Sequence, residues 1–539
     1  MQAVKASRKS SDQLSGHILL VRRISSPSIN IGGDGLDGHR KWTSQPDSIG
    51  STEHKLPFFS VWSRAMPRLS PLPDYKGIHA TVMGLGRFGG GLSATRFLAQ
   101  RGASVVVTDL QNAANLVDSL AAIQDIPIAR LALGGHPEDV LDDCQLLIVN
   151  PAVPPDHPLV ALARTRGIEV TTEIELFLRH NPASVIAVTG SNGKSTTTAL
   201  IHHLLTQAYP DFEGRIWLGG NIGISLLDQL EAIQPRDIVV LELSSFQLTL
   251  LAEKRFRPDI AVLTNYSPNH LDWHGSEAAY RKAKQSIFDA QMPDDAAIIP
   301  DDTDAHDDRN VPQWRIRCGG MKFGLTDLGD HGAFLEGGTL ILRSQSFEDA
   351  VRLAVPHQLP GRHNQLNIAA AACAAWLAGA DSTRFSMALQ SFRPLPHRLQ
   401  LVVEKSGRQF WNDSIATTPE SAIMALHVFP GRIILLAGGY DKGQDFTRFA
   451  AEIKLKASAV VLMGQTAGKL HELLTDGPND LQIGIAADFR EAFRCAVAFS
   501  QQGDIVLLSP GCASYGWFKD FRERGDLFSA LARDWSPDT

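Results

Sequence analysis

Cysteine is scarce in this chain, and the positions of the few cysteines exclude two kinds of structural site. The 539 residues include five cysteines, which lie far apart and form no Cys-x-x-Cys pair. A disulfide framework needs paired cysteines, and a structural zinc site needs closely spaced ones. We therefore expect neither, and the composition favours the reducing environment of the cytoplasm.

Long apolar runs are missing as well. No stretch approaches the roughly 18 to 20 apolar residues that a membrane helix needs, and the early run at 18–21 is too short for the core of a signal peptide. The 51 basic and 58 acidic residues give a net charge of -7, which indicates neither nucleic acid nor an anionic membrane as a partner. We therefore expect small-molecule partners and a local site for any anion.

The first 72 residues differ in composition from the rest. They are rich in Ser, Gly, Arg and Lys and show no sustained hydrophobic period, which predicts disorder. A basic, Ser-rich stretch also fits a transit peptide, although its acidic residues count against that interpretation. The third alternative is a misassigned start, with Met66 as the true first residue.

From residue 78 onward, short apolar runs alternate with helical patterns. The runs at 80–83, 104–108 and 146–149 predict buried parallel strands, with a helix at 89–100 between the first two. The same alternation restarts at residue 185 and again after residue 398. Strand–helix alternation of this kind predicts parallel sheets, so we predict an α/β protein with three domains.

The clearest local motif is a glycine-containing loop at 189–196, TGSNGKST, which follows a strand and opens a helix. In that position backbone N–H groups and the helix N-terminus bind phosphate oxygens. Lys194 would reach the β- and γ-phosphates, and Ser195 or Thr196 would face Mg²⁺. The loop is shorter than the standard pattern, since Val188 stands where the first glycine belongs. A chance glycine turn before a helix is the alternative.

Three more residues of the same region fit a nucleotide and metal site. Glu242 ends a predicted strand, where ligand-binding residues of open α/β sheets concentrate. His270 also follows a strand and has the chemistry of a metal ligand. Each has a plainer interpretation: a solvated acid for Glu242, a structural histidine for His270, and a solvated helix lysine for Lys284.

Together these segments resemble the Mur ligase family over residues 75–535. The segments that carry the similarity are 189–196 (TGSNGKST), 219–223 (GGNIG), 241–247 (LELSSFQ), 363–364 (HN), 395–398 (LPHR), 411–414 (WNDS) and 509–514 (SPGCAS). Among the members, the chain is most similar to the branch that adds D-glutamate to UDP-N-acetylmuramoyl-L-alanine. The resemblance implies an ATP-dependent amide ligase that works through an acyl phosphate, as a cytoplasmic monomer with ATP and two Mg²⁺ ions.

The family also implies the order of the domains. A Rossmann-like UDP-binding domain is expected at 73–172, and a central P-loop ATPase domain with a mostly parallel sheet at 173–394. A second Rossmann-like domain, which binds glutamate, is expected at 395–539.

Residue roles at the ATP site follow from the same resemblance. The residues implied to bind ATP are Gly190, Ser191, Asn192, Gly193, Lys194, Ser195, Thr196, Asn364, Arg398 and Asp413. The residues implied to hold the metal ions are Ser195, Glu242, His270 and Lys284, and the last three with Lys194 form the implied catalytic set. Lys284 matches a carbamylated lysine, and the carbamate oxygen of such a residue suits hard Mg²⁺.

The first predicted domain carries Gly84-Leu85-Gly86-Arg87-Phe88-Gly89 after a strand, and Asp109 after the next strand. By itself this pattern is typical of a dinucleotide site, in which the acid binds a ribose hydroxyl. The resemblance instead assigns Gly86, Arg87 and Phe88 to the UDP diphosphate and Asp109 to uracil. It assigns Asn221 to the muramoyl-alanine part of the substrate.

Two departures from the family pattern concern the amino acid and the metal. The D-glutamate branch usually continues Lys-Ala-Thr-Asn after 412–414, but this chain has Ile-Ala-Thr-Thr at 415–418. Lys442 is then the remaining cation for the distal carboxylate, and the residues expected to line the pocket with it are Thr417, Ser514 and Phe521. Asn269 stands where many relatives carry an acid.

Three alternatives stay open at this point. The variant at 415–418 also matches a branch that uses L-glutamate. The chain could instead be another ligase of the family, such as a folylpolyglutamate or diaminopimelate-adding relative, although the first domain and the SPGCAS segment count against both. From another class, it could be a nucleotide-binding regulatory protein with an inactive ATPase loop.

Overall fold

The computed structural model describes most of the chain after residue 74. The described residues are 75–86, 89–151, 153–222, 225–301, 313–329, 331–344, 347–353, 359–477 and 480–537. The interpretations of residues 1–72, including Met66, lie outside these ranges, as do Arg87 and Phe88. No helix of the described residues is long and apolar enough to span a membrane.

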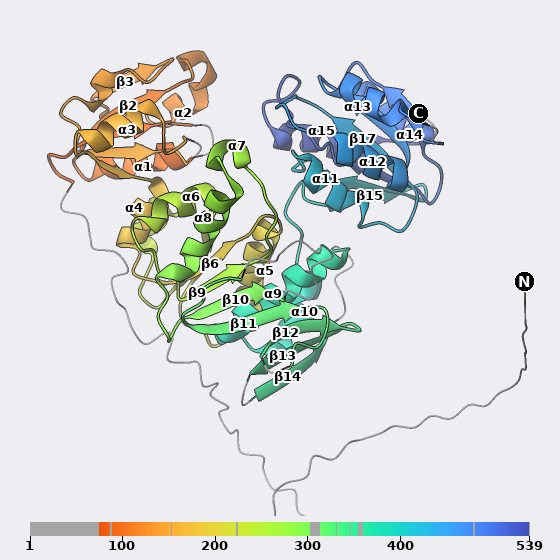
Figure 1. The fold of residues 1–539 in the computed structure, drawn as a ribbon, viewed down its shortest axis with the longest axis horizontal. Helices are drawn as coiled ribbons and strands as arrows, with labels where there is room; N and C mark the ends of the chain where they lie inside the picture. The colour runs from red at the N-terminus through yellow and green to blue at the C-terminus, as the bar shows by residue number, and fades with distance from the viewer. Residues whose placement is uncertain are drawn as a thin grey trace, which may run out of the picture. The chain divides into compact units, whose positions relative to one another are not determined.

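The first sheet has five parallel strands in the order β3-β2-β1-β4-β5, of which Figure 1 labels β2 and β3. Its strands are β1 (His79–Met83), β2 (Ser104–Asp109), β3 (Arg130–Leu133), β4 (Leu146–Val149) and β5 (Glu169–Thr171). The helices of this region are α1 (Gly90–Gln100), η2 (Ala113–Asn115), α2 (Val117–Ala121), η3 (Glu138–Leu141), α3 (Pro158–Thr165) and α4 (Glu173–His180). Strand β4 is buried along its whole length, as its unbroken apolar sequence predicts.

The second sheet has nine strands in the order β14-β13-β12-β11-β10-β9-β6-β8-β7. Its strands are β6 (Ser184–Thr189), β7 (Ile216–Gly220), β8 (Ile238–Glu242), β9 (Ile260–Leu263), β10 (Ala296–Pro300), β11 (Gly319–Gly324), β12 (Gly332–Glu336), β13 (Thr339–Ser344) and β14 (Phe347–Arg352). Only the β12–β13 and β13–β14 pairs are antiparallel. The sheet is therefore mostly parallel, as predicted.

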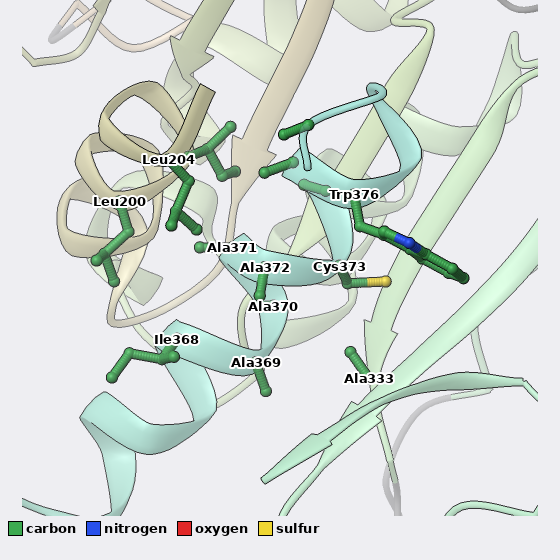
Figure 2. Close-up of a cluster of buried hydrophobic side chains, with 14 of the residues drawn as sticks. Leu200, Leu204, Ala333, Ile368, Ala369, Ala370, Ala371, Ala372, Cys373 and Trp376 are labelled. Carbon is green, nitrogen blue, oxygen red and sulfur yellow. The ribbon is translucent and has the colours of Figure 1, made fainter. Parts of the chain in front are cut away.

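Two long helices of this region, α5 (Lys194–Ala208) and α9 (Arg362–Leu377), pack against each other. Helix α5 follows the glycine-containing loop at 189–196 (the phosphate loop), and α9 carries the HN segment at 363–364. The other helices of this region are η4 (Leu226–Ala232), α6 (Ser245–Ala252), α7 (Leu271–His274), α8 (Glu277–Asp289), η6 (Ser382–Arg384) and α10 (Phe385–Ser391). Helix α9 carries four consecutive buried alanines at 369–372, whose small side chains let it pack closely on more than one side, against α5 and against the sheet. Figure 2 shows Ala371 on the side of Leu204 of α5 and Cys373 on the side of Ala333 of β12.

The third sheet has six strands in the order β15-β16-β20-β17-β18-β19, of which only the β15–β16 pair is antiparallel. Its strands are β15 (Gln400–Lys405), β16 (Arg408–Asn412), β17 (Ile433–Gly438), β18 (Ala457–Met463), β19 (Gln482–Ile485) and β20 (Ile505–Leu508). Its helices are α11 (Pro419–Leu426), α12 (Thr447–Lys456), α13 (Ala467–Thr475), α14 (Phe489–Phe499) and α15 (Phe521–Asp534). Three sheets in chain order confirm the predicted three-domain α/β fold, while the exact domain boundaries stay a prediction.

Candidate functional site

The glycine-containing loop lies between β6 and α5, where the backbone needs glycine at two positions. Gly190 has φ 150° and Gly193 has φ 77°, both in the region that L-residues rarely adopt. A Cβ atom at Gly190 would lie 1.9 Å from Thr264 Oγ1, and one at Gly193 would lie 2.4 Å from Asn367 Oδ1. The loop can therefore expose its N–H groups ahead of α5 only with these glycines in place.

Two lysine amines meet on one side of this loop. The Nζ atom of Lys194 donates to the main-chain oxygens of Gly190 (3.0 Å) and Ser191 (2.9 Å). The Nζ atom of Lys284 donates to the same Gly190 oxygen at 2.7 Å. Lys284 is only 1% exposed, so its interpretation as a solvated lysine is wrong: α8 turns this residue inward, which its sequence position alone does not reveal.

Burial sets the protonation of both amines. It lowers the pKa of Lys284 well below its ordinary value, and the neighbouring Lys194 lowers that pKa further, while Glu242 opposes both effects. Burial also lowers the pKa of Lys194. A buried amine without a bound anion favours its neutral form, so the site favours an anion beside these lysines.

The carboxylate of Glu242 lies at the end of β8 and is 2% exposed. Its Oε1 accepts a 3.1 Å hydrogen bond from Asn221 Nδ2, whereas its buried Oε2 has no hydrogen-bond partner among the described residues. The alternative of a solvated acid is therefore wrong. A buried carboxylate oxygen without a donor is costly unless a cation or a bound ligand satisfies it.

His270 faces the same cavity as Glu242. Its backbone is left-handed, with φ 53°, and its ring lies 4.9 Å from the ring of Phe246, centroid to centroid. No three His, Cys, Asp or Glu side chains of the described residues come together as a ready metal cluster. The residues still fit Mg²⁺, because the Glu242 oxygen that has no partner among the described residues belongs to the same cleft as Ser195 and Thr196, and Mg²⁺ usually keeps waters and substrate phosphates as ligands beside one or two carboxylates.

Arg398 joins the loop from the segment between the second and third sheets. Its Nη2 donates to Ser195 Oγ at 3.3 Å, and its Nε is buried without a hydrogen-bond partner in the described part of the chain. The nearby carboxyl group of Asp413 accepts from Ser509 Oγ (2.8 Å) and from the Leu399 N–H (3.1 Å). Burial raises the pKa of Asp413 to about 7, against the opposing effect of these hydrogen bonds and of Arg398.

Asn367 is a residue of this site that sequence reasoning missed. Its Oδ1 accepts from Thr197 Oγ1 at 3.2 Å, and its Nδ2 donates to Asn364 Oδ1 at 3.2 Å. It thereby connects the predicted residue Asn364 to the helix that follows the phosphate loop. The sequence signal that could have identified Asn367 is its spacing of three residues from Asn364, which places both side chains on one face of a helix.

A single cleft of about 1000 Å³ brings most of the predicted residues together. The predicted residues that line it are Ser191, Asn192, Gly193, Lys194, Ser195, Thr196, Asn221, Glu242, His270, Asn364, Arg398, Asp413, Thr417 and Phe521. Gly190 and Lys284 do not line the cleft, but the hydrogen bond between them joins Lys284 to the loop. The cleft is also lined by residues that the sequence did not single out, among them Asn150, Glu173 and Ser225.

In the first domain, Asp109 holds the glycine-rich turn rather than facing open solvent. Its Oδ2 accepts from the Gly86 N–H at 3.1 Å, and its Oδ1 accepts from the Gln111 N–H at 2.8 Å. Gly91 is needed for close packing, since a Cβ there would lie 2.1 Å from the Gly84 oxygen. Neither Gly86 nor Asp109 lines the large cleft, although Gly84 and Gly91 do.

The predicted glutamate residues fall into three places. Thr417 and Phe521 line the large cleft, and Ser514 lines a smaller cavity of about 170 Å³ that includes Arg524 and Trp517. Lys442 is exposed, and its Nζ lies 5.5 Å from the centre of the Tyr515 ring. The structure does not bring Lys442 into either cavity, so its role stays a prediction.

Comparison with known proteins adds a second line of evidence. Family models match three successive parts of the chain: the MurD-like N-terminal domain of Mur ligases at 78–172, the Mur ligase middle domain at 188–375, and the Mur ligase glutamate ligase domain at 397–512. These matches correspond to the three sheets in order.

Two curated relatives match this chain over nearly the whole of their own length. A UDP-N-acetylmuramoylalanine–D-glutamate ligase of Roseiflexus sp. (strain RS-1) is 38% identical over 467 residues, which are 85% of this chain and 99% of that protein. The enzyme of the same name from Geobacillus kaustophilus (strain HTA426) is 38% identical over 463 residues, 85% of this chain and 98% of that protein.

Solved structures share the fold. The UDP-N-acetylmuramate–alanine ligase of Thermotoga maritima superimposes with a TM-score of 0.53 at 20% identity, over 85% of this chain and 99% of that one. The MurF ligase of Thermotoga maritima in complex with ADP gives a TM-score of 0.50 at 18% identity, over 86% and 99%. At such identities the similarity concerns the three-domain fold alone.

Proposed function

The chain belongs to the Mur ligase family, and from this premise we propose that it joins glutamate to UDP-N-acetylmuramoyl-L-alanine at the expense of ATP. D-glutamate is the proposed amino acid, because the curated relatives are D-glutamate ligases over nearly their whole length. That similarity is the observation that carries the proposal. The product is a precursor of peptidoglycan, and the proposed location is the cytoplasm, with the enzyme acting as a monomer.

The nucleotide end of the cleft is proposed to bind ATP. The loop at 190–196 supplies backbone N–H groups, and Lys194 and Arg398 supply positive charge for the phosphates. The buried Arg398 Nε without a partner among the described residues supports this assignment, since a phosphate oxygen would satisfy it. Asn364 and Asp413 are proposed to contact the nucleoside.

Two Mg²⁺ ions are proposed beside the phosphates, held by Ser195, Glu242, His270 and Lys284, the last as a carbamate. When bound, the ions offset negative charge on the transferred phosphoryl group. The unpartnered Oε2 of Glu242 supports the set. The lowered pKa of Lys284 supports the carbamate, because only a neutral amine captures CO₂.

The reaction divides into two steps. The alanyl carboxylate attacks the γ-phosphorus of ATP, which forms an acyl phosphate and releases ADP. The amine of glutamate then attacks the acyl carbon and phosphate leaves. Both steps need positioning and charge compensation more than covalent participation of the protein. Lys194 is proposed to hold the phosphates, and Asn221, which contacts Glu242, to orient the muramoyl-alanine end.

The UDP moiety and glutamate have separate proposed sites. Gly86, Arg87, Phe88 and Asp109 are proposed for the UDP moiety, and the hydrogen bond from the Gly86 N–H to the Asp109 carboxyl group supports a shared site for these two residues. Thr417, Lys442, Ser514 and Phe521 are proposed for glutamate.

The direct test measures ADP release with UDP-N-acetylmuramoyl-L-alanine and each glutamate enantiomer. The proposal expects release that requires both the UDP-linked substrate and glutamate, with D-glutamate as the better substrate. Release with L-glutamate alone would assign the chain to the L-glutamate variant. ATP binding without any substrate-dependent release would instead support the regulatory protein with an inactive loop.

A further inference from the structure

Glu173 is a cleft residue that the reaction scheme above does not use. It is the first residue of α4, which Thr172 caps by accepting from the Glu175 N–H. Its Oε1 accepts a short hydrogen bond from Ser225 Oγ, and both residues line the large cleft. Ser225 in turn caps η4 by accepting from the Leu227 N–H, so the partner of the carboxyl group is itself held in place.

The surroundings of Glu173 place it beside the proposed site of the UDP-linked substrate. Its Cβ lies 3.9 Å from the position that a Cβ would take at Gly90, which begins α1 just after the glycine-rich turn. Asn150 and Asn221 line the same cleft. A carboxyl group and two amide groups are typical of sites that bind sugar hydroxyl and acetamido groups through hydrogen bonds.

We propose that Glu173, held by Ser225, binds the UDP-linked substrate by hydrogen-bonding an uncharged polar group of its sugar. The inference rests on the proposed function and adds a substrate-binding residue to it. Because Glu173 lies beside Gly90, which follows the residues assigned to the diphosphate, a negative charge on its carboxyl group would repel that substrate.

The surroundings of Glu173 shift its carboxyl group toward the uncharged form. Burial raises the pKa of Glu173 to about 7, Asp228 raises it as well, and the Ser225 hydrogen bond opposes both. The other charged side chains on the packed elements are engaged elsewhere: Arg96 of α1 donates to the Ala122 oxygen, Glu231 of η4 pairs with Arg101, and Glu175 of α4 pairs with Arg179. Asp228 itself accepts from Ser93 Oγ at 2.6 Å.

Binding of UDP-N-acetylmuramoyl-L-alanine, measured by calorimetry without ATP or glutamate, tests the inference. Between pH 6 and pH 8 the Kd of the wild-type protein should rise roughly tenfold, because one carboxyl with a pKa of about 7 must hold its proton for binding. Glu173→Gln, which stays neutral, should bind as the wild type does at pH 6 and lose this rise. Glu231→Gln is the matched control, because that side chain is 91% exposed, and should follow the wild type.

Two further variants keep the test independent of how well Glu173→Gln folds. Ser225→Ala should move the onset of weaker binding to higher pH, and Asp228→Asn should move it to lower pH. An equal rise of Kd with pH in wild type and Glu173→Gln, or shifts in the same direction in the other two variants, would overturn the inference alone. A wild-type protein that does not bind the UDP-linked substrate would overturn the proposed function together with it.

Discussion

The amine of Lys284 donates a 2.7 Å hydrogen bond to the main-chain oxygen of Gly190, which lies 94 residues earlier in the chain. Lys194 donates to the same oxygen at 3.0 Å, so one carbonyl receives hydrogen bonds from two lysine amines. This arrangement is unfavourable while both amines are charged, and it becomes favourable when one of them is neutral or converted to an anion. The first two predictions concern these two lysines.

Replacing Lys284 with Ala should abolish ADP release. If the amine acts as a carbamate, millimolar acetate or formate should restore part of the activity by supplying an anion at the same place. Lys282→Ala is the control, because Lys282 is an exposed lysine of the same helix, and it should behave as the wild type. Unchanged activity in Lys284→Ala would remove this lysine from the site.

Replacing Lys194 with Ala should also abolish turnover, because the phosphates lose their nearest positive charge. The fold should persist, since the hydrogen bonds of this side chain to described residues go to main-chain oxygens of its own loop. ADP release and the circular dichroism spectrum of the variant check the two halves of this prediction. Near-normal release would contradict the assignment of the loop to ATP.

Asp413 predicts a dependence of stability on pH. Its pKa is about 7 in the folded protein and about 3.9 in an unfolded chain, so the folded state binds more protons between these values. The contribution of Asp413 to stability therefore falls as pH rises from about 4 to about 7 and is lowest above that range. Asp413→Asn should be more stable than the wild type at pH 8 and should lose this part of the pH dependence, while ATP turnover falls. Denaturant unfolding of both proteins at pH 5 and pH 8 measures it.

Lys442 is predicted to bind the distal carboxylate of glutamate. Because an unpaired carboxylate in a closed site is costly, Lys442→Ala should raise the KM for glutamate far more than the KM for ATP. Lys469→Ala removes a nearby exposed lysine that pairs with Asp441 and should leave the KM for glutamate unchanged. An equal KM for glutamate in the wild type and in Lys442→Ala would exclude this lysine from the pocket. The test is informative because Lys442 is exposed in the structure.

The preference for one enantiomer of glutamate is the last prediction. A site that holds the distal carboxylate while it directs the amine toward the acyl phosphate does not fit both enantiomers equally. Initial rates with D- and L-glutamate should differ strongly in the wild type, in favour of D-glutamate. Ile415→Lys restores the lysine usual in the D-glutamate branch and should increase that preference. Equal rates with both enantiomers would refute the two-point binding of glutamate.

Local sequence patterns determined much of this protein. The helix over 90–100 and the strands at 79–83, 104–109 and 146–149 lie within one residue of where the apolar patterns predict them, because a strand buried on both faces is apolar throughout and bounded by polar turns. The need for glycine at 190 and 193 also followed from the sequence motif. Each of these residues has a positive φ, which residues other than glycine rarely adopt.

Tertiary structure decided what each polar side chain touches. Lys284 is exposed or buried according to which face of α8 packs inward, and Asn367 of α9 contacts Thr197 of α5 only because these two helices pack together. The charge states of Asp413 and Glu173 likewise come from burial by segments distant in the chain. Sequence patterns record short-range periodicity and turn chemistry, whereas desolvation and hydrogen bonding between distant segments exist only once the chain has folded.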